Sequence, residues 1–469
     1  KHFSVGCSFE KPGAMAGVPW NCIGLCVISY TMVHISVQII TCSLPCLQHD
    51  VSFKEPWSTT DCGRVIGYAS LAAAIGYGVH GPCIDRWGAV FGLSMALGGC
   101  CAGAALLATS QTQAQFIAGA SVLRFSYAAG WPAEMKALKL LVPEEHQPMA
   151  VSTLGFASRG GAILGMCFFG VLTQNEILTW RQIAVQASTI LLVIGGGVVL
   201  LVRQLVRAAP SEGRGKQQPF LSMLQEPAVW LLTFAFSCLC HVQHADDYMP
   251  LLFRGLTGSS HSVTFSAVYP GGGIAAMVLN AWKGHLLTRR QREQLYVIAS
   301  AMSAACLALL LLVHHTQDGP ESTPLMTWII ALILFVAAFC CAMPYYLVPN
   351  LFAFDLMGTE CATLIAFFEW TSFCSKMPAH MLSLRMAETS WDLVLLQLAI
   401  TMSFAAILIQ ALLPRWRSLQ KHRRHGGISP LTNSPPIAAG SPKKIVSELC
   451  LEEAQDEHVA GYAALSKRK

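Results

Sequence analysis

Residues 81–88 read Gly-Pro-Cys-Ile-Asp-Arg-Trp-Gly, a short polar stretch between two long apolar ones. The apolar stretches that flank it, 63–80 and 89–109, are each close to the ~20 residues that an α-helix needs to cross the hydrocarbon core of a bilayer. Glycine at both ends of the polar stretch permits a tight turn. We therefore predict two membrane-spanning helices joined here by a short charged turn.

The remainder of the chain repeats this alternation. Stretches of similar length and apolarity are separated by short polar loops, and a longer loop at 203–227 divides the chain near its middle. The pattern predicts an all-α membrane protein with twelve transmembrane helices in two pseudo-symmetric six-helix bundles. The predicted spans are 20–42, 63–80, 89–109, 113–135, 149–172, 180–202, 228–250, 262–283, 294–314, 326–347, 360–378 and 391–413.

The composition supports a membrane protein and argues against other classes. Hydrophobic residues make up 54% of the 469 residues and charged residues 12%, whereas a soluble domain carries roughly 25% charged residues. No block of basic residues with interleaved aromatic residues is present, so nucleic acid is not an expected partner. We find no P-loop, no metal-ligand spacing and no Ser/His/Asp arrangement in the sequence, so no enzyme, cofactor or metal site is predicted.

The positive charges of the loops predict the orientation. With the N-terminus inside, the cytoplasmic loops hold most of the Lys and Arg residues, which is the usual bias of membrane proteins. These residues are Arg86, Lys136, Lys139, Arg203, Arg207, Arg214, Lys216, Arg289, Arg290 and Arg292, followed by those after 414. Both termini are therefore predicted to be cytoplasmic. The predicted parts are an N-terminal segment 1–19, bundles 20–202 and 228–413, the loop 203–227 and a disordered tail 414–469 rich in Gly, Ser and Pro.

The two halves of the chain echo each other. Gly284-His-Leu-Leu-Thr-Arg289 follows the eighth span as the stretch at 81–86 follows the second, and His34 and His244 lie 210 residues apart in the first and seventh spans. Internal duplication is typical of transporters that move one half against the other.

On these residues the chain resembles the major facilitator superfamily. The stretch 81–88 is similar to its loop signature G-x-x-x-D-R-x-G. The resemblance implies a secondary transporter that works by alternating access, with the first, fourth, seventh and tenth spans around a central cavity. It also implies gating roles for Gly81, Asp85, Arg86 and Gly88.

A second resemblance is narrower. Gly-Trp-Pro-Ala-Glu-Met-Lys at 130–136, together with residues 355–363, is similar to segments of the organophosphate:phosphate antiporters. This resemblance implies exchange of a phosphorylated sugar or glycerol phosphate for inorganic phosphate.

Three ionisable residues are predicted at the depth of the bilayer core, where insertion of a charge costs at least about 2.5–3.5 kcal/mol. Arg124 and Arg159, in the fourth and fifth spans, would either bind an anionic substrate bidentately or hold helices together through ion pairs. Glu369, in the eleventh span, would neutralise a buried arginine near the position of Arg159 in the repeat, or carry a proton.

Two helical faces carry further candidate substrate contacts. Tyr30, His34 and Gln38 are spaced at i, i+4 and i+8 in the first span, which places them on one face. His241, His244 and Tyr248 form a comparable stripe in the seventh span. Histidine can hydrogen-bond an anion or transfer protons near neutral pH.

These residues predict a secondary transporter of a small organic anion, in one form a phosphorylated sugar or glycerol phosphate exchanged for phosphate. The expected partners are this small molecule, the lipid bilayer, and protons or phosphate as coupling species. An alternative is a proton-coupled carrier of a neutral or cationic solute that uses Glu369 and the histidines. A third hypothesis is a non-transporting membrane receptor that signals through its Ser-Pro tail.

Overall fold

The structure is a computed structural model that describes residues 20–47, 57, 59–174, 177–208, 220–258, 267–315, 323–358 and 361–424. Within these ranges the regular structure is helical throughout. Residues up to Gln420 belong to one compact unit. The predicted segment 1–19 and the Ser-Pro part of the tail lie outside the described residues.

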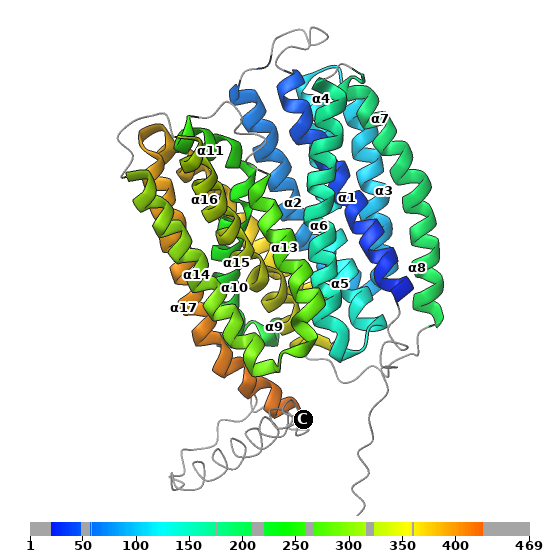
Figure 1. The fold of residues 1–469 in the computed structure, drawn as a ribbon. Coiled ribbons are helices and arrows are strands. Elements are labelled where there is room, and N and C mark those ends of the chain that lie inside the picture. Colours follow the sequence, from blue (N-terminus) through cyan, green and yellow to red (C-terminus); the bar gives the residue numbers. More distant parts are fainter. Residues whose placement is uncertain are drawn as a thin grey trace, which may run out of the picture. The chain divides into compact units, whose positions relative to one another are not determined.

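The helices follow the predicted spans in order (Figure 1). The first six spans correspond to α1 (Trp20–Leu47), α2 (Thr59–Trp87), α3 (Ala89–Thr109), α4 (Gln113–Tyr127) with α5 (Gly130–Leu141), α6 (Gln147–Gln174), and α7 (Trp180–Ile190) with the π-helical turn η3 (Leu191–Gly195) and α8 (Gly196–Ala208). The second six correspond to α10 (Pro227–Gln243) with the 3₁₀ turn η4 (His244–Asp247) and α11 (Met249–Thr257), then α13 (Val268–Lys283), α14 (Arg289–His315), α15 (Pro324–Met357), α16 (Cys361–Thr389) and α17 (Trp391–Arg424). Three short elements, η2 (Glu144–His146), α9 (Phe220–Met223) and η5 (Gly284–Leu286), lie in connections.

Several helices are apolar and long enough to cross a membrane by themselves. The described residues contain seven such segments: Trp20–Ile40, Ala89–Thr109, Trp180–Arg207, Pro227–Asp246, Arg289–His315, Pro324–Met357 and Trp391–Lys421. Helices α2, α6 and α16 are of comparable length, with 28 or 29 residues each. The chain is therefore an integral membrane protein that crosses the bilayer several times.

The two halves meet along two helix pairs. Helix α2 packs on α16, and α6 packs on α13, which lies beside it in Figure 1. The first contact is very close at Gly81, where an added Cβ atom would lie 2.5 Å from the Cβ atom of Ala366. A hydrophobic cluster built mainly from the second half also contains Trp131, Met135 and Leu154 of the first half. The halves thus share a continuous apolar core at the end where α2, α5 and α15 finish.

Four helices, α2, α15, α16 and α17, extend well beyond their predicted limits. Residues 81–87 are helical rather than a turn, because α2 continues to Trp87 and the chain reverses at Gly88, whose φ of 94° suits glycine. Helix α15 continues through Pro344 to Met357, past its predicted end at 347, and α16 continues to Thr389, past its predicted end at 378. Helix α17 continues to Arg424, past the predicted boundary at 413, and Arg417 Nε donates to Glu293 Oε2 at 2.6 Å in this extension.

Candidate functional site

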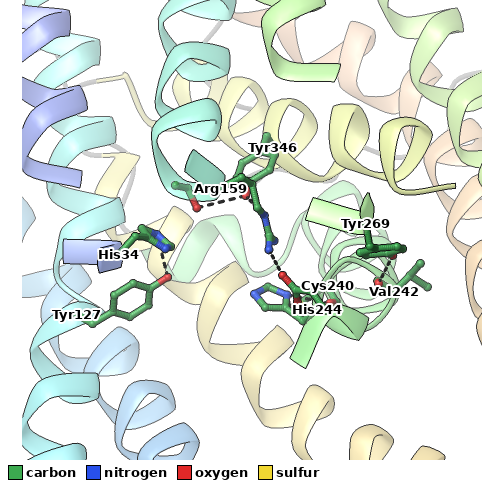
Figure 2. A network of polar contacts seen from close by, with 10 residues as sticks. His34, Tyr127, Arg159, Cys240, Val242, His244, Tyr269 and Tyr346 are labelled. Atoms are coloured by element: carbon green, nitrogen blue, oxygen red, sulfur yellow. Dashed lines mark hydrogen bonds and ion pairs between the residues drawn. The ribbon is translucent and has the colours of Figure 1, made fainter. Parts of the chain in front are cut away.

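A polar and aromatic group on α1 and α4 occupies the first half of the site. Tyr127 Oη and His34 Nε2 are 3.3 Å apart, and the two rings are drawn together in Figure 2. The ring of Tyr30 meets that of His34 edge to face at 4.5 Å between centroids. Two residues of the predicted stripe, Tyr30 and His34, therefore contact each other as their i, i+4 spacing requires.

Gln38, the third residue of that stripe, lies one turn further along α1. Its side chain is buried, and its Cβ atom would be 2.9 Å from a Cβ atom added to Gly165 of α6. Among the described residues, no hydrogen-bond partner is present for its Oε1 atom. A buried amide oxygen without a partner is costly, so this atom is a candidate ligand contact.

The predicted stripe on the seventh span is divided by a change of helix type. Helix α10 ends at Gln243, and η4 follows, so the i, i+3, i+7 spacing no longer places the three residues on one face. His244 Nδ1 lies 3.0 Å from the carbonyl oxygen of Cys240, and its ring contacts Tyr345 and Phe373. The rings of His241 and Tyr248 instead both contact the ring of His380, with 5.2 Å between ring centroids in each pair. The expectation of one continuous stripe is wrong for this helix.

Arg159 joins the two halves of the molecule. Its Nε atom donates a hydrogen bond to Tyr346 Oη at 2.8 Å, and its guanidinium forms an ion pair with Asp246 of η4. Figure 2 shows the side chain extending from Tyr346 toward the residues around His244. Glu369, which we expected either to neutralise a buried arginine near this position or to carry a proton, is not the ion-pair partner of Arg159, because the turn at η4 brings Asp246 to it.

Arg124 has a different environment. It is half-buried on α4, and its guanidinium carbon lies 5.6 Å from the centroid of the Tyr127 ring, a cation–π contact. Among the described residues, no acidic side chain forms an ion pair with it. The site therefore contains a cation beside His34 and Tyr127 whose charge the described carboxylates do not neutralise directly.

Glu369 and Lys376 lie on one face of α16, seven residues apart. Both are buried, and no ion pair within 4.0 Å joins Glu369 to any described cation. The Lys376 ammonium lies 5.1 Å from the centroid of the Phe373 ring between them.

Aromatic rings connect these groups across the boundary between the halves. The ring centroid of Trp131 lies 5.1 Å from that of Tyr30 and 5.9 Å from that of Tyr346. The Nε1 atom of Trp131 donates a hydrogen bond to Asn350 Oδ1 at 3.1 Å. On another helix pair, Tyr77 of α2 contacts Phe373 of α16 at 5.2 Å. We call these rings the aromatic belt; its members are Tyr30, Tyr77, Tyr127, Trp131, Tyr345, Tyr346 and Phe373.

Residues 81–88, at the end of α2, form a separate contact between the halves. Asp85 Oδ1 accepts a hydrogen bond from Lys136 Nζ at 3.0 Å, and Asp85 Oδ2 accepts one from the main-chain N–H of Thr363 at 2.6 Å. Thr363 is in the first turn of α16, where N–H groups lack helical partners and the helix dipole favours a negative charge. Arg86, which we had grouped with Asp85, is exposed and lies over the ring of Trp87.

Trp131 was not selected from the sequence as a site residue, although an aromatic residue inside a predicted span was the available signal. Asp246 and Tyr346 were expected at the rim or gate of the cavity and not as partners of Arg159, and Lys376 was expected to extend to the membrane surface. Gln243, fully buried with no partner among the described residues for either amide atom, was also missed.

Two packed helical halves with a polar site at their boundary are the arrangement of many secondary carriers. The chain matches the Major Facilitator Superfamily over residues 26–360 and belongs to that family. It is a transporter and not an enzyme, and this membership favours transport over the receptor hypothesis.

Solved structures of the same fold support this membership. The proton:xylose symporter XylE bound to 6-bromo-6-deoxy-D-glucose is 14% identical, with a TM-score of 0.64 over 85% of this chain and 95% of that one. The transporter FucP in the outward conformation is 14% identical, with a TM-score of 0.61 over 83% and 98% of the two chains. The fucose:proton symporter FucP of E. coli, as a variant, is 14% identical, with a TM-score of 0.62 over 84% and 99%. No curated protein matches the sequence significantly.

Proposed function

We propose that this protein is a secondary transporter of a small organic anion that works by alternating access. The observation that carries the proposal is Arg124, a half-buried cation with no acidic partner among the described residues. A charge at bilayer depth requires compensation, and a substrate anion supplies it. A guanidinium binds carboxylate or phosphate oxygens through two parallel hydrogen bonds.

We assign the remaining residues of the site by their surroundings. His34, Tyr30, Gln38 and His244 would orient the anion from the two halves. His241 and Tyr248, which contact His380, would lie further from Arg124 along the seventh span. Arg159 is assigned to the boundary between the halves, because Asp246 and Tyr346 already satisfy its guanidinium.

In the narrower form of the proposal, the anion is a phosphorylated sugar or glycerol phosphate that is exchanged for phosphate. The support is the stretch 130–136, whose Trp131 and Lys136 both make contacts at the boundary or gate. Helix α1 contains no Lys or Arg. Arg124, beside His34 of α1, would then be the residue that grips the phosphate group.

A second candidate is a proton-coupled carrier of a neutral solute. The aromatic belt supports it, because flat rings pack well against the apolar faces of a sugar. Glu369 would carry the proton in this case. XylE is a proton:xylose symporter and FucP a fucose:proton symporter, but at 14% identity they support the fold alone.

The first experiment is counterflow in reconstituted proteoliposomes that contain phosphate, with labelled phosphate or glucose 6-phosphate outside. We expect exchange by the wild-type protein and a loss of at least about thirtyfold in Arg124→Ala, because truncating one member of a buried charge pair costs about 2–5 kcal/mol. Arg124→Lys, which keeps the charge, is expected to retain part of the activity. Normal exchange in folded Arg124→Ala would remove the anion site, and pH-driven uptake of xylose or fucose instead would establish the second candidate.

We further propose that the Asp85 contacts close the cytoplasmic end, in the orientation with both termini inside. Asp85→Ala removes the acceptor of both the Lys136 and the Thr363 hydrogen bonds. Cys361, at the start of α16, is 0% exposed. We expect it to be alkylated roughly tenfold faster in Asp85→Ala than in the wild type, since each hydrogen bond to a charged group contributes about 1.5–3 kcal/mol.

Peptide-resolved mass spectrometry after thiol labelling measures this rate. The matched control is Arg86→Ala, which removes an exposed neighbouring charge and is expected to change little. Equal labelling of Cys361 in Asp85→Ala and the wild type would contradict the gating role.

A further inference from the structure

Glu134 of α5 is a buried acid that the proposed function does not use. It is 0% exposed. Among the described residues, no ion pair within 4.0 Å joins it to a cation, and its Oε2 atom has no hydrogen-bond partner. Burying an ionised carboxylate without a cation costs so much free energy that the group takes up a proton instead.

The contacts of Ser29 on α1 fit the protonated form of Glu134. Ser29 Oγ is hydrogen-bonded to Glu134 Oε1 and also lies 2.9 Å from the main-chain carbonyl oxygen of Cys26. A hydroxyl group has one proton to donate. If Glu134 is protonated, it donates to Ser29 and Ser29 donates to Cys26, so both contacts are hydrogen bonds. If Glu134 is ionised, Ser29 can donate fully to only one of the two acceptors. The geometry therefore favours the neutral acid.

The helices packed on α5 provide Glu134 with no ion pair. Helix α3 contains no Asp, Glu, Lys, Arg or His. The ionisable residues of the other packed helices and of α5 itself have their own contacts, are exposed, or are thiols and phenols. They are Cys22, Cys26 and Tyr30 on α1, Asp85 on α2 with Lys136 on α5, Lys139 over Phe354, Arg124 over Tyr127, Arg159 with Asp246, Asp355 on α15 with Trp416, Cys361 on α16, and the exposed Arg203 and Arg207 on α8.

Glu134 lies between two residues that connect α5 to the contact between the halves. Trp131, one turn before it, donates a hydrogen bond to Asn350 of α15 in the second half. Lys136, just after it, donates to Asp85, whose other carboxylate oxygen is bonded to the first turn of α16. Separation of the halves at this end would therefore break contacts on both sides of Glu134.

The second half also contributes to the cover that keeps water from Glu134. Cys26 of α1 and Met135 of α5, which are sequence neighbours of Ser29 and Glu134, are buried in the hydrophobic cluster built mainly from the second half. Separation of the halves would remove that part of the cover. A carboxyl group that water reaches can ionise without the cost of burial.

We propose that Glu134 binds a proton while the end of the molecule at Asp85 is closed, and releases it to water when that end opens. The O–H bond of the carboxylic acid breaks, the proton passes to a water molecule, and the carboxylate that remains is hydrated. Because the proton binds the closed conformation in preference, lower pH favours closure and higher pH favours opening. This inference goes beyond the substrate of the transporter and shares with the proposed function only the closure at Asp85.

The test is the rate at which Cys361, buried at the same end, is alkylated at pH 6 and pH 8. Each wild-type rate is divided by the rate for Glu134→Gln, a mimic of the protonated acid, at the same pH. The ionisation of the thiol is common to both proteins and cancels in this ratio. We expect a ratio near one at pH 6 and roughly tenfold higher at pH 8, which is the effect of one linked proton over one pH unit.

Glu144→Gln is the matched control, because it removes the charge of an exposed glutamate just beyond α5. It is expected to follow the wild type at both pH values. Infrared spectroscopy provides a second measurement that does not depend on Glu134→Gln being folded. At pH 6 we expect the C=O stretching band of a protonated carboxyl group, and a shift of this band in Ser29→Ala, which keeps Glu134 but removes its hydrogen-bond partner.

The outcomes separate this inference from the closure at Asp85. A ratio that is the same at pH 6 and pH 8 overturns the proton site, and so does the lack of a carboxyl band that responds to Ser29→Ala. If Asp85→Ala still accelerates the labelling of Cys361 in that case, the gating role of Asp85 stands without a proton on Glu134. If Asp85→Ala has no effect on the labelling either, the closure at this end and the inference fail together.

Discussion

Replacing Arg159 by Met is expected to lower the free energy of unfolding by about 3–5 kcal/mol, because it leaves the carboxylate of Asp246 partly buried without its cation. Asp246→Leu is expected to have a similar effect, since it strands the guanidinium. Each variant would also lose a connection between the first half and η4. Unfolding of the purified protein in mixed micelles, followed by circular dichroism, measures the difference.

The double variant Arg159→Met with Asp246→Leu makes this prediction specific. Removing both charges removes both desolvation costs, so we expect it to be much more stable than either single variant. If Arg159 only connects the two halves and does not bind substrate, the folded double variant should also keep the wild-type half-saturating concentration for phosphate. Additive losses of stability in the double variant would show that the two side chains do not act as a pair. A large loss of phosphate affinity in a stable double variant would return Arg159 to the substrate site.

Substituting Gly81 by Val is expected to separate α2 from α16 and abolish transport. Even a single added carbon at this position would lie 2.5 Å from the Cβ atom of Ala366 and 3.1 Å from the Cα atom of Thr363. The second of these atoms belongs to the backbone and cannot rotate away. Overpacking of this kind typically costs about 1–3 kcal/mol, and the shift would also move Thr363 away from Asp85. The melting temperature in detergent and counterflow activity measure the two consequences.

Gly78 provides the matched control for this prediction, because it lies on α2 one turn earlier. A Cβ atom there would be 3.7 Å from the Trp370 side chain, which is ordinary van der Waals contact. Gly78→Ala is therefore expected to retain stability and exchange, whereas Gly81→Ala already loses part of both. Equal behaviour of these two alanine variants would refute the close approach of α2 and α16 at Gly81.

The number and order of the helices could be predicted from the sequence, because apolar length is encoded locally. The ends of α2, α15 and α17 could not, since hydropathy reports where the bilayer ends and not where the helix ends. Helix α17 continues beyond its apolar stretch, and Arg417 in this extension donates a hydrogen bond to Glu293. For α2, the helix ends only where Gly88 adopts its positive φ.

The polar residues of the site could be selected from the sequence, but their partners could not. One residue of error in helix rotation turns a side chain by about 100°, and the turn of η4 introduces such a change within the seventh span. Asp246 therefore reaches Arg159, while His241 and Tyr248 meet His380. The contact of Asp85 with Thr363 was hidden for another reason, because its donor is a main-chain group that no residue type reveals.

Because this donor is a main-chain group, positions 363 and 85 are expected to tolerate substitution to different degrees. Every amino acid except proline supplies an amide N–H, so position 363 is free to change its side chain while the bond to Asp85 persists. Position 85 has no such freedom, because its carboxylate must meet both the amide and Lys136. A saturation library would accordingly accept most small residues and reject proline at 363, and accept almost nothing but aspartate at 85.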